Sequence, residues 1–232
     1  MHVRYTLITA DPERIDDAIA YLASDGGSRL ESEPGERGMS LQVSPDLAVA
    51  VLESFWVSHD AMRESERVEA GVRDEAIRLA LGTASVERFR RASVTRVGRE
   101  ESGAGVRHTV YQTNPAALDE AIAGYEDTAV PWLTETDGFV SAALLVDHRS
   151  GRQLSQTIWR DIDALVKSRS PAAAIRADAV AATDSAVTIA QTRKVRRKTE
   201  RTSESPTSRS YCPRPGFGSV TLHAATPRNG AA

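Results

Sequence analysis

The chain has 232 residues, of which 41% are hydrophobic, and a formal net charge of −3, with a single cysteine, Cys212. This length fits two compact domains. No apolar run approaches the roughly 20 residues that span a bilayer, so we expect no membrane contacts. A single cysteine cannot form an intrachain disulfide, which is typical of a cytoplasmic protein. Residues 193–232 hold nine Lys and Arg against two Glu, which leaves an acidic body and argues against nucleic-acid binding by the folded part.

The first segment of the chain predicts a strand followed by a helix. Residues 3–10 alternate between two faces, as a strand does. Asp11 then supplies an N-cap and Pro12 suits the first helical position. The i, i+3, i+4, i+7 spacing of an amphipathic helix follows at Ile15, Ala18, Ile19 and Leu22. We expect Gly26 and Gly27 to end this helix.

Further strands and helices complete the first half of the chain. Strands are predicted at about 38–43 and 47–56, around a turn at Ser44-Pro45-Asp46. Helical sequence follows at roughly 59–69 and 72–81, and a last strand at about 84–95.

An ungapped offset of 103 residues maps this first half onto the second. Eight of the twenty positions in 3–22 are identical to their counterparts in 106–125, and the same offset pairs Trp56 with Trp159. The second half therefore repeats the order β-α-β-β-α-β, with strands at about 138–146, 152–160 and 186–192 and helices at 161–168 and 171–181. We expect an α+β fold of two tandem ferredoxin-like units, at 1–97 and 104–192, joined by a linker at 98–103.

Each predicted unit leaves one face of its sheet uncovered. A ferredoxin-like unit has a single helix layer on an antiparallel sheet. Two copies can bury their open faces against each other, so we expect the units to pack sheet to sheet as an intrachain pseudo-dimer.

The segment 193–232 breaks the periodic pattern. Its mixture of Ser, Thr, Pro, Arg and Gly cannot bury enough apolar surface to offset the entropy of ordering, which predicts a basic disordered tail. Two origins stay open, a native basic arm and a frameshifted end of a GC-rich gene.

Each half contains a strand that ends in Trp and runs directly into helical sequence. Strand parity places Trp56 with Leu52 and Ser54, and Trp159 with Ser155 and Thr157, on the more polar face of the sheet. Two interpretations are open for both rings. The ring fills space beneath the following helix, or its indole N–H lies at the wall of a ligand pocket between sheet and helix.

On this strand–Trp–helix motif, the chain resembles the antibiotic biosynthesis monooxygenase family over about residues 2–192. The resemblance implies ferredoxin-like units whose sheets join into an α/β barrel, here as an intrachain pseudo-dimer that is monomeric or forms a homodimer. It also implies a cofactor-independent monooxygenase that acts on an aromatic or quinol-type small molecule, without metal or flavin. A non-catalytic small-ligand-binding or assembly protein of the same fold is the alternative.

The haem-degrading branch of that family combines the Trp with an Asn on the first strand and a His on the helix. The first strand has no Asn in either half, and Asn114 is interpreted as a helix cap. His59 lies three residues after Trp56, but its counterpart is Ile162. We therefore do not expect haem degradation.

The candidate substrate-binding residues are Trp56, Trp159, His59, Tyr5, His108 and Tyr111. His108 replaces Tyr5 in the second half, on the strand face of Val106, where a core histidine is more typical than a proton shuttle. Together with the change of His59 to Ile162, this divergence predicts at most one working site per chain. No catalytic residue is identified.

Two further features bear on the site. Arg107 shares a strand face with Tyr111, and Arg4 takes the same place in the first half, so these arginines are either ligand contacts or solvated strand residues. The histidines are scattered without the spacing of zinc ligands, and no metal site is expected.

Overall fold

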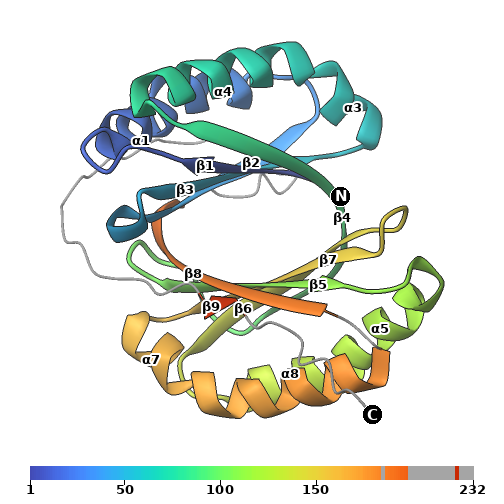
Figure 1. The fold of residues 1–232 in the computed structure, drawn as a ribbon. Coiled ribbons are helices and arrows are strands. Elements are labelled where there is room, and N and C mark those ends of the chain that lie inside the picture. Colours follow the sequence, from blue (N-terminus) through green and yellow to red (C-terminus); the bar gives the residue numbers. More distant parts are fainter. Residues whose placement is uncertain (184–185, 198–222, 225–232) are drawn as a thin grey trace, which may run out of the picture. The chain divides into compact units, whose positions relative to one another are not determined.

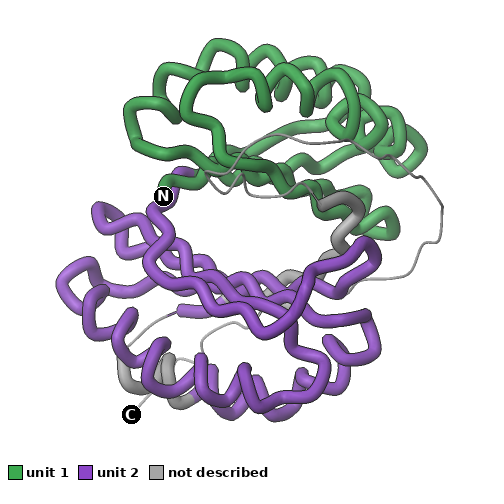
Figure 2. Tube along the Cα trace, turned by 180° about the vertical axis from the view of Figure 1, so that it is seen from behind, with its two compact units in different colours: residues 1–87, 196–220 green, residues 88–195, 221–232 purple. Residues whose placement is uncertain are grey.

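The structure is a computed structural model that describes residues 1–183, 186–197 and 223–224, and the chain divides into two compact units. Unit 1 consists mainly of Met1–Glu87 and unit 2 mainly of Arg88–Val195 (Figure 2). In each unit the helices cover one face of an antiparallel sheet (Figure 1).

Unit 1 follows the order β-α-β-β-α-β, with each helical stretch broken into two helices. Its elements are β1 (His2–Thr9), α1 (Ile15–Ala23), α2 (Asp25–Glu31), β2 (Glu36–Ser44), a 3-10 turn (Pro45–Leu47), β3 (Val49–Trp56), α3 (His59–Glu64), α4 (Glu66–Ala80) and the first residues of β4 (Thr83–Arg96). The strand order is β2-β3-β1-β4, and both β1 and β2 run antiparallel to β3.

Unit 2 repeats this order. After the second part of β4 it contains β5 (Gly105–Gln112), a 3-10 turn (Pro115–Ala117), α5 (Leu118–Gly124), the π-helical turn η3 (Tyr125–Ala129), α6 (Val130–Glu135), β6 (Phe139–Asp147), β7 (Arg152–Trp159), α7 (Ile162–Lys167), α8 (Arg169–Thr183), β8 (Ala186–Arg197) and β9 (His223–Ala224). The strand order is β4-β6-β7-β5-β8-β9.

The central strands of the two units pair in the same register. Arg4 on β1 lies opposite Ser54 on β3, and Arg107 on β5 lies opposite Thr157 on β7. Residues 103 positions apart thus occupy equivalent places in their own sheets. The predicted α+β fold with ferredoxin-like order is confirmed, whereas the face-to-face packing of the two sheets stays a prediction.

Strand β4 serves both units and shifts the predicted boundary. The division between the units falls after Glu87, within β4, rather than at residue 97. The reason is that Arg90–Arg96 pair antiparallel with Ser141–Val146 of β6 in unit 2. A strand of this length completes one sheet with its first residues and extends another with its last ones.

The predicted linker at 98–103 connects β4 to β5 and is anchored to unit 2. Glu100 within it is buried, and its Oε1 accepts a hydrogen bond from Ser141 Oγ at 2.7 Å. At the other end of the unit, β8 continues to Arg197, beyond the expected end of the last strand at 192. Apart from that extension and 223–224, the predicted tail lies outside the described residues.

Two local expectations about the first helix were wrong. Gly26 and Gly27 do not end it, because α1 already ends at Ala23 and both glycines lie in α2. A side chain at Gly27 would meet the Leu22 carbonyl oxygen at 2.6 Å, so close packing between the two short helices requires glycine there. Asp11 does accept a hydrogen bond from Glu13 N at 2.8 Å, but this forms a turn before α1 begins at Ile15.

Gly151, in the turn between β6 and β7, should not tolerate a side chain. Its φ is +72°, and an added Cβ would lie 2.0 Å from the Thr113 carbonyl oxygen. Gly103 has a similar φ of +89°, but a Cβ added there would meet no atom within 4 Å. Substitution of Gly103 therefore measures the cost of the backbone conformation alone. We expect Gly103→Ala to cost about 1 kcal/mol of unfolding free energy and Gly151→Ala about 2 kcal/mol or more in urea unfolding. Equal costs would contradict the steric argument.

Candidate functional site

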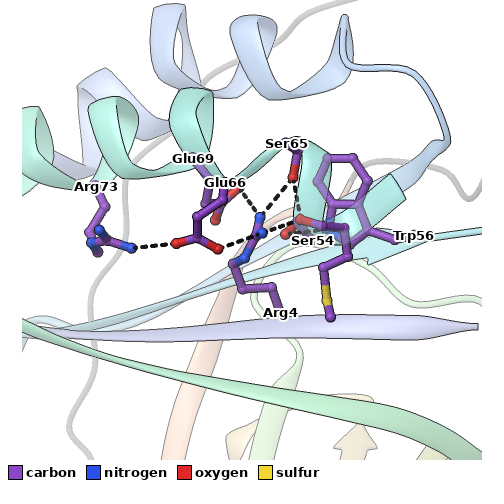
Figure 3. Close-up of polar contacts among 8 residues, drawn as sticks. Arg4, Ser54, Trp56, Ser65, Glu66, Glu69 and Arg73 are labelled. Carbon is purple, nitrogen blue, oxygen red and sulfur yellow. Dashed lines mark hydrogen bonds and ion pairs between the residues drawn. The ribbon is translucent and has the colours of Figure 1, made fainter. Parts of the chain in front are cut away.

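A buried arginine lies beneath the helices of unit 1. The side chain of Arg4 is fully buried, so its interpretation as a solvated strand residue is wrong. Its Nη1 donates to Ser65 Oγ at 3.0 Å, and its Nη2 donates to the Met62 carbonyl and to Glu66 Oε2 at 3.0 Å (Figure 3). These contacts tie β1 to the break between α3 and α4.

Carboxylates of α4 neutralise this arginine within the chain. Glu69 Oε2 lies 3.2 Å from Arg4 Nη1 and is itself buried, and Glu66 also lies 3.8 Å from Arg73 Nη1. Arg73 Nε lies 3.6 Å from a carboxylate oxygen of Asp74. Burial raises the pKa of Glu69, although the Arg4 charge acts in the opposite direction. Unit 1 therefore supplies its own anions for its buried cation.

The two tryptophans are fully buried between sheet and helices. Trp56 Nε1 donates to Ser54 Oγ at 3.0 Å, and Trp159 Nε1 donates to Thr157 Oγ1 at 3.0 Å. The guanidinium of the neighbouring arginine lies 5.6 Å from the Trp56 ring centroid and 5.8 Å from that of Trp159. Both indole N–H groups are thus bonded inside the chain, which favours the interpretation that the rings fill space.

Arg107 repeats the backbone and hydroxyl contacts of Arg4 in unit 2. It is only 3% exposed, and its Nη2 donates to the Leu165 carbonyl at 2.7 Å and to Ser168 Oγ at 3.0 Å. These acceptors follow the corresponding residues of unit 1 by 103 positions. Arg107 therefore joins β5 to the break between α7 and α8.

The carboxylates that lie near Arg4 and Arg73, in contrast, have no counterparts on α8. The residues at the positions of Glu66, Glu69 and Asp74 are Arg169, Ala172 and Ala177. Within the described part of the chain, neither Arg107 nor Arg176 takes part in an ion pair. Burial, and after it the charges of Arg176 and Arg169, lower the pKa of Arg107 to about 10. The group stays charged at neutral pH in a site without a counter-ion from the described residues.

Polar side chains also replace apolar ones around this arginine. Where unit 1 has the buried Ile8, Leu22 and Leu52, unit 2 has Tyr111, Tyr125 and Ser155. Ser155 Oγ donates to Tyr125 Oη at 3.2 Å. Burial raises the pKa of Tyr125 to about 12 and raises that of Tyr111 as well. Both phenols therefore keep their protons at neutral pH and can donate hydrogen bonds.

Aromatic rings line the other side of the site. The Trp159 ring packs edge to face on Phe139, with 5.7 Å between centroids, and lies 6.5 Å from Trp132. Tyr125 packs against the same core cluster and opens the π-helical turn η3. Such turns occur frequently at functional sites. We define the unit 2 site by Arg107, Tyr111, Tyr125, Trp132, Trp159 and Arg176.

The structure separates the other candidate residues from this site. Tyr5 and His108 lie on the opposite face of their sheets, as strand parity predicted. His108 is buried with its Nε2 at 3.2 Å from Gln156 Nε2, and burial lowers its pKa to about 4. The His59 side chain is 62% exposed at the start of α3, with its ring 5.8 Å from that of His2. Three of the six candidates, Trp56, Trp159 and Tyr111, thus face the helices.

Sequence reasoning missed the residues that give the site its chemistry. Tyr125, Trp132 and Arg176 were not singled out as candidates. The 103-residue offset carried a usable signal, because Arg73 and Arg176 correspond while Glu66 and Asp74, which pair with Arg73, do not recur. Among the described residues, no three His, Cys, Asp or Glu side chains group together as a metal site would require. In the same part of the chain, no helix has the length and apolar character needed to cross a membrane.

Substituting the two corresponding arginines should have unequal effects. Arg4→Met leaves Glu69 buried without its ion-pair partner, which should cost about 3–5 kcal/mol of unfolding free energy at pH 7. Arg107→Met removes a charge that has no carboxylate partner among the described residues. It should cost about 1–2 kcal/mol, because two hydrogen bonds are lost. Urea unfolding measures both.

The pH dependence of Arg4→Met tests the same assignment. The native state already holds the Glu69 proton more tightly than the unfolded chain, and loss of the arginine strengthens this preference. The cost of the substitution should therefore shrink as the pH falls from 7 to 5. A cost that grows in acid would contradict the assignment.

His108 should make the protein sensitive to acid. Its pKa is about 4 in the native state and 6.5 when unperturbed, so the unfolded chain binds the proton first. The stability present above pH 6.5 should fall by about 1.4 kcal/mol per pH unit as the pH drops towards 4. Between pH 7.5 and 5, His108→Gln should lose about 2 kcal/mol less unfolding free energy than the wild type. If the variant and the wild type lost equal unfolding free energy, a group other than His108 would cause the acid sensitivity.

Solved structures of low sequence identity share this fold. A candidate monooxygenase from Fusobacterium nucleatum superposes with a TM-score of 0.65 at 12% identity, over 86% of this chain and 94% of its own. An anthrone oxidase-like protein also has a TM-score of 0.65, at 14% identity, over 89% of this chain and 97% of its own. At these identities the comparison shows a common fold.

Relatives in sequence come from Mycobacterium tuberculosis strain H37Rv. No family model matches the chain. The uncharacterised proteins Rv2557 and Rv2558 are each 32% identical to it over 177 residues, which is 76% of this chain and 79% and 75% of theirs. The chain therefore belongs to the protein family that includes Rv2557 and Rv2558.

Proposed function

We propose that unit 2 binds an aromatic or quinol-type small molecule between its sheet and its helices and oxidises it with molecular oxygen. The observation that carries this proposal is the change from unit 1 to unit 2 at equivalent positions, where Ile8 and Leu22 give way to Tyr111 and Tyr125. Arg107, which is buried and forms no ion pair with a described residue, lies on the same strand face as Tyr111. The fold shared with a candidate monooxygenase and an anthrone oxidase-like protein supports the class of reaction.

The residues of the site suit such a substrate. The partly exposed ring of Trp132, which lies 6.5 Å from the buried Trp159 ring, offers apolar surface on which an aromatic ring can pack. The protonated phenols of Tyr111 and Tyr125 donate hydrogen bonds to substrate oxygens. The Arg107 charge stabilises the anion that forms when the substrate loses a proton, and so lowers the pKa of the substrate.

The reaction then needs no reductant beyond the substrate itself. A ring methylene para to a carbonyl, as in an anthrone, becomes a second carbonyl. The substrate supplies the electrons that reduce oxygen, one oxygen atom enters the product, and the other leaves as water. The role of the protein is to bind and orient the substrate and, through the charge of Arg107, to lower the pKa of the substrate.

Unit 1 serves as the structural counterpart in this proposal. Its interior is closed by Ile8, Leu22 and Leu52, and its buried arginine is neutralised by Glu66 and Glu69. We infer that both units derive from one duplicated ancestor and that their sheets pack as an intrachain pseudo-dimer. The equivalent contacts of Arg4 and Arg107 support the duplication.

A ligand-binding protein without catalysis is the second candidate function. In the described site, the tyrosine pKa values are raised and that of Arg107 is about 10. A general base is most effective near the working pH, and these groups do not provide one. This observation favours binding over a proton transfer by the protein.

Oxygen uptake distinguishes the two functions. With a panel of quinols, anthrones and flavonols, we expect substrate-dependent oxygen consumption in an oxygen electrode. Tyr125→Phe should lower kcat/KM about tenfold, because it removes one donor to the substrate. The matched control is Tyr21→Phe on α1, which removes a buried hydroxyl that has no hydrogen-bond partner in the described part of the chain and should leave kcat/KM unchanged.

Each outcome assigns a function. Binding without oxygen uptake across the panel would favour the non-catalytic alternative. Uptake that is insensitive to Tyr125→Phe would contradict the placement of the site in unit 2. Absence of both binding and uptake would contradict the aromatic-ligand proposal.

A further inference from the structure

We infer that the ligand of unit 2 is an aromatic carboxylate whose acid group binds Arg107 as the carboxylate of Glu69 binds Arg4 in unit 1. This inference rests on the proposed ligand site and names the chemical class of its ligand. Unit 1 supplies the template, since its buried guanidinium and buried carboxylate lie 3.2 Å apart.

The charge balance of the two units motivates the inference. A charge taken out of water is costly unless it is paired, and buried charges in proteins are normally compensated. Arg4 has two carboxylate partners, Glu66 and Glu69. Arg107 is equally deep in its unit, yet the corresponding side chains are cationic or absent. Its partners among the described residues are a carbonyl and a hydroxyl.

The contacts of Arg107 leave part of its guanidinium available. Both of its hydrogen bonds use Nη2, so Nη1 and Nε have no hydrogen-bond partner among the described residues. In Arg4, Nη1 is the atom that faces the Glu69 carboxylate. The replacement of Glu69 by Ala172 removes that carboxylate from the corresponding position on α8. A planar carboxylate matches the edge of a guanidinium better than a single point charge does.

A second cation and a phenol strengthen the preference for an anion. Arg176 is partly exposed and forms no ion pair with a described residue, whereas its counterpart Arg73 has two carboxylate neighbours. Tyr111 lies within electrostatic range of both Arg107 and Arg176. A negative ligand that approaches from solvent would meet Arg176 and then reach the buried Arg107.

The aromatic rings beside Arg107 favour an aromatic acid over a free anion as the ligand. Trp159, Phe139 and Trp132 form a contiguous set of rings, and the Arg107 guanidinium lies 5.8 Å from the first of them. A carboxylate attached directly to an aromatic ring places its charge and its apolar surface at this spacing. An inorganic phosphate would use the arginines and leave the rings without a partner.

Calorimetric titration at pH 7.5 with two probes of equal shape tests the inference. The probes are 2-naphthoate and its neutral amide, 2-naphthamide. We expect the full-length protein to bind 2-naphthoate at least about tenfold more tightly, as is usual for a buried charge-assisted pair. Inorganic phosphate serves as the competitor without a ring and should displace 2-naphthoate only at a much higher concentration.

Ala172→Glu places the unit 1 carboxylate into unit 2 without altering the arginine. We expect it to occupy Arg107, to abolish the preference for 2-naphthoate and to raise the thermal transition of the ligand-free protein. The matched control is Ala173→Glu, which adds the same charge at the next, exposed residue of α8 and should bind like the wild type. If Ala172→Glu fails to fold, Arg107→Met provides the second test and should weaken binding of 2-naphthoate but not of 2-naphthamide.

The outcomes separate this inference from the proposed function. Equal affinities for 2-naphthoate and 2-naphthamide would overturn the inference that the site recognises a carboxylate, but would leave the proposed aromatic site in place. Retention of the preference in folded Ala172→Glu or in Arg107→Met would overturn the placement at Arg107. If phosphate bound as well as 2-naphthoate, the inference that the ligand is an aromatic acid would be overturned. Binding of neither aromatic probe would overturn the proposed site as well.

Discussion

A guanidinium buried beneath the helices holds each unit together at one point. The last carbonyls of a helix lack partners within that helix. In unit 1, Arg4 donates to the Met62 carbonyl in the last turn of α3 and to Ser65 at the start of α4, and Arg107 does the same in unit 2 through Leu165 and Ser168. The charge is also favourable at the negative end of a helix dipole. The break in the helix layer, the position of the Trp and the first strand therefore depend on one side chain.

This shared contact makes the difference between the units informative. Both units use the hydrogen bonds of the arginine in their architecture, but among the described residues only those of unit 1 supply carboxylate partners for it. Glu69 is buried at a cost that its raised pKa reflects, and loss of either partner would leave the other charge buried and unpaired. Unit 2 keeps the cation and replaces the anions by Arg169 and Ala172. A fold that tolerates this arrangement can use the uncompensated charge to select a ligand.

The fold alone leaves the chemistry open, since one architecture hosts many functions. What distinguishes unit 2 is a set of local substitutions within an unchanged framework. Tyr111 and Ser155 come from sheet positions and Tyr125 from a π-helical turn in the helix layer. They converge because the strands and helices of both units keep the same register and order. The scaffold thus positions the site, and the residue types determine what it can bind.

Periodicity and internal repetition in the sequence were enough to predict the α+β fold, the order of the elements and the strand faces of Trp56, Trp159 and Tyr111. These features depend on neighbours within a few residues, or on comparison of the chain with itself. The exchange of partners by β4 and the burial of Gly26 and Gly27 within α2 depend on distant contacts, and the sequence pattern gave no sign of them. The same holds for the arginines. Strand parity placed Arg4 and Arg107 on the helix-covered face, but an arginine is normally solvated. Only the tertiary structure decided that they are buried, because their partners lie about 60 residues further along the chain.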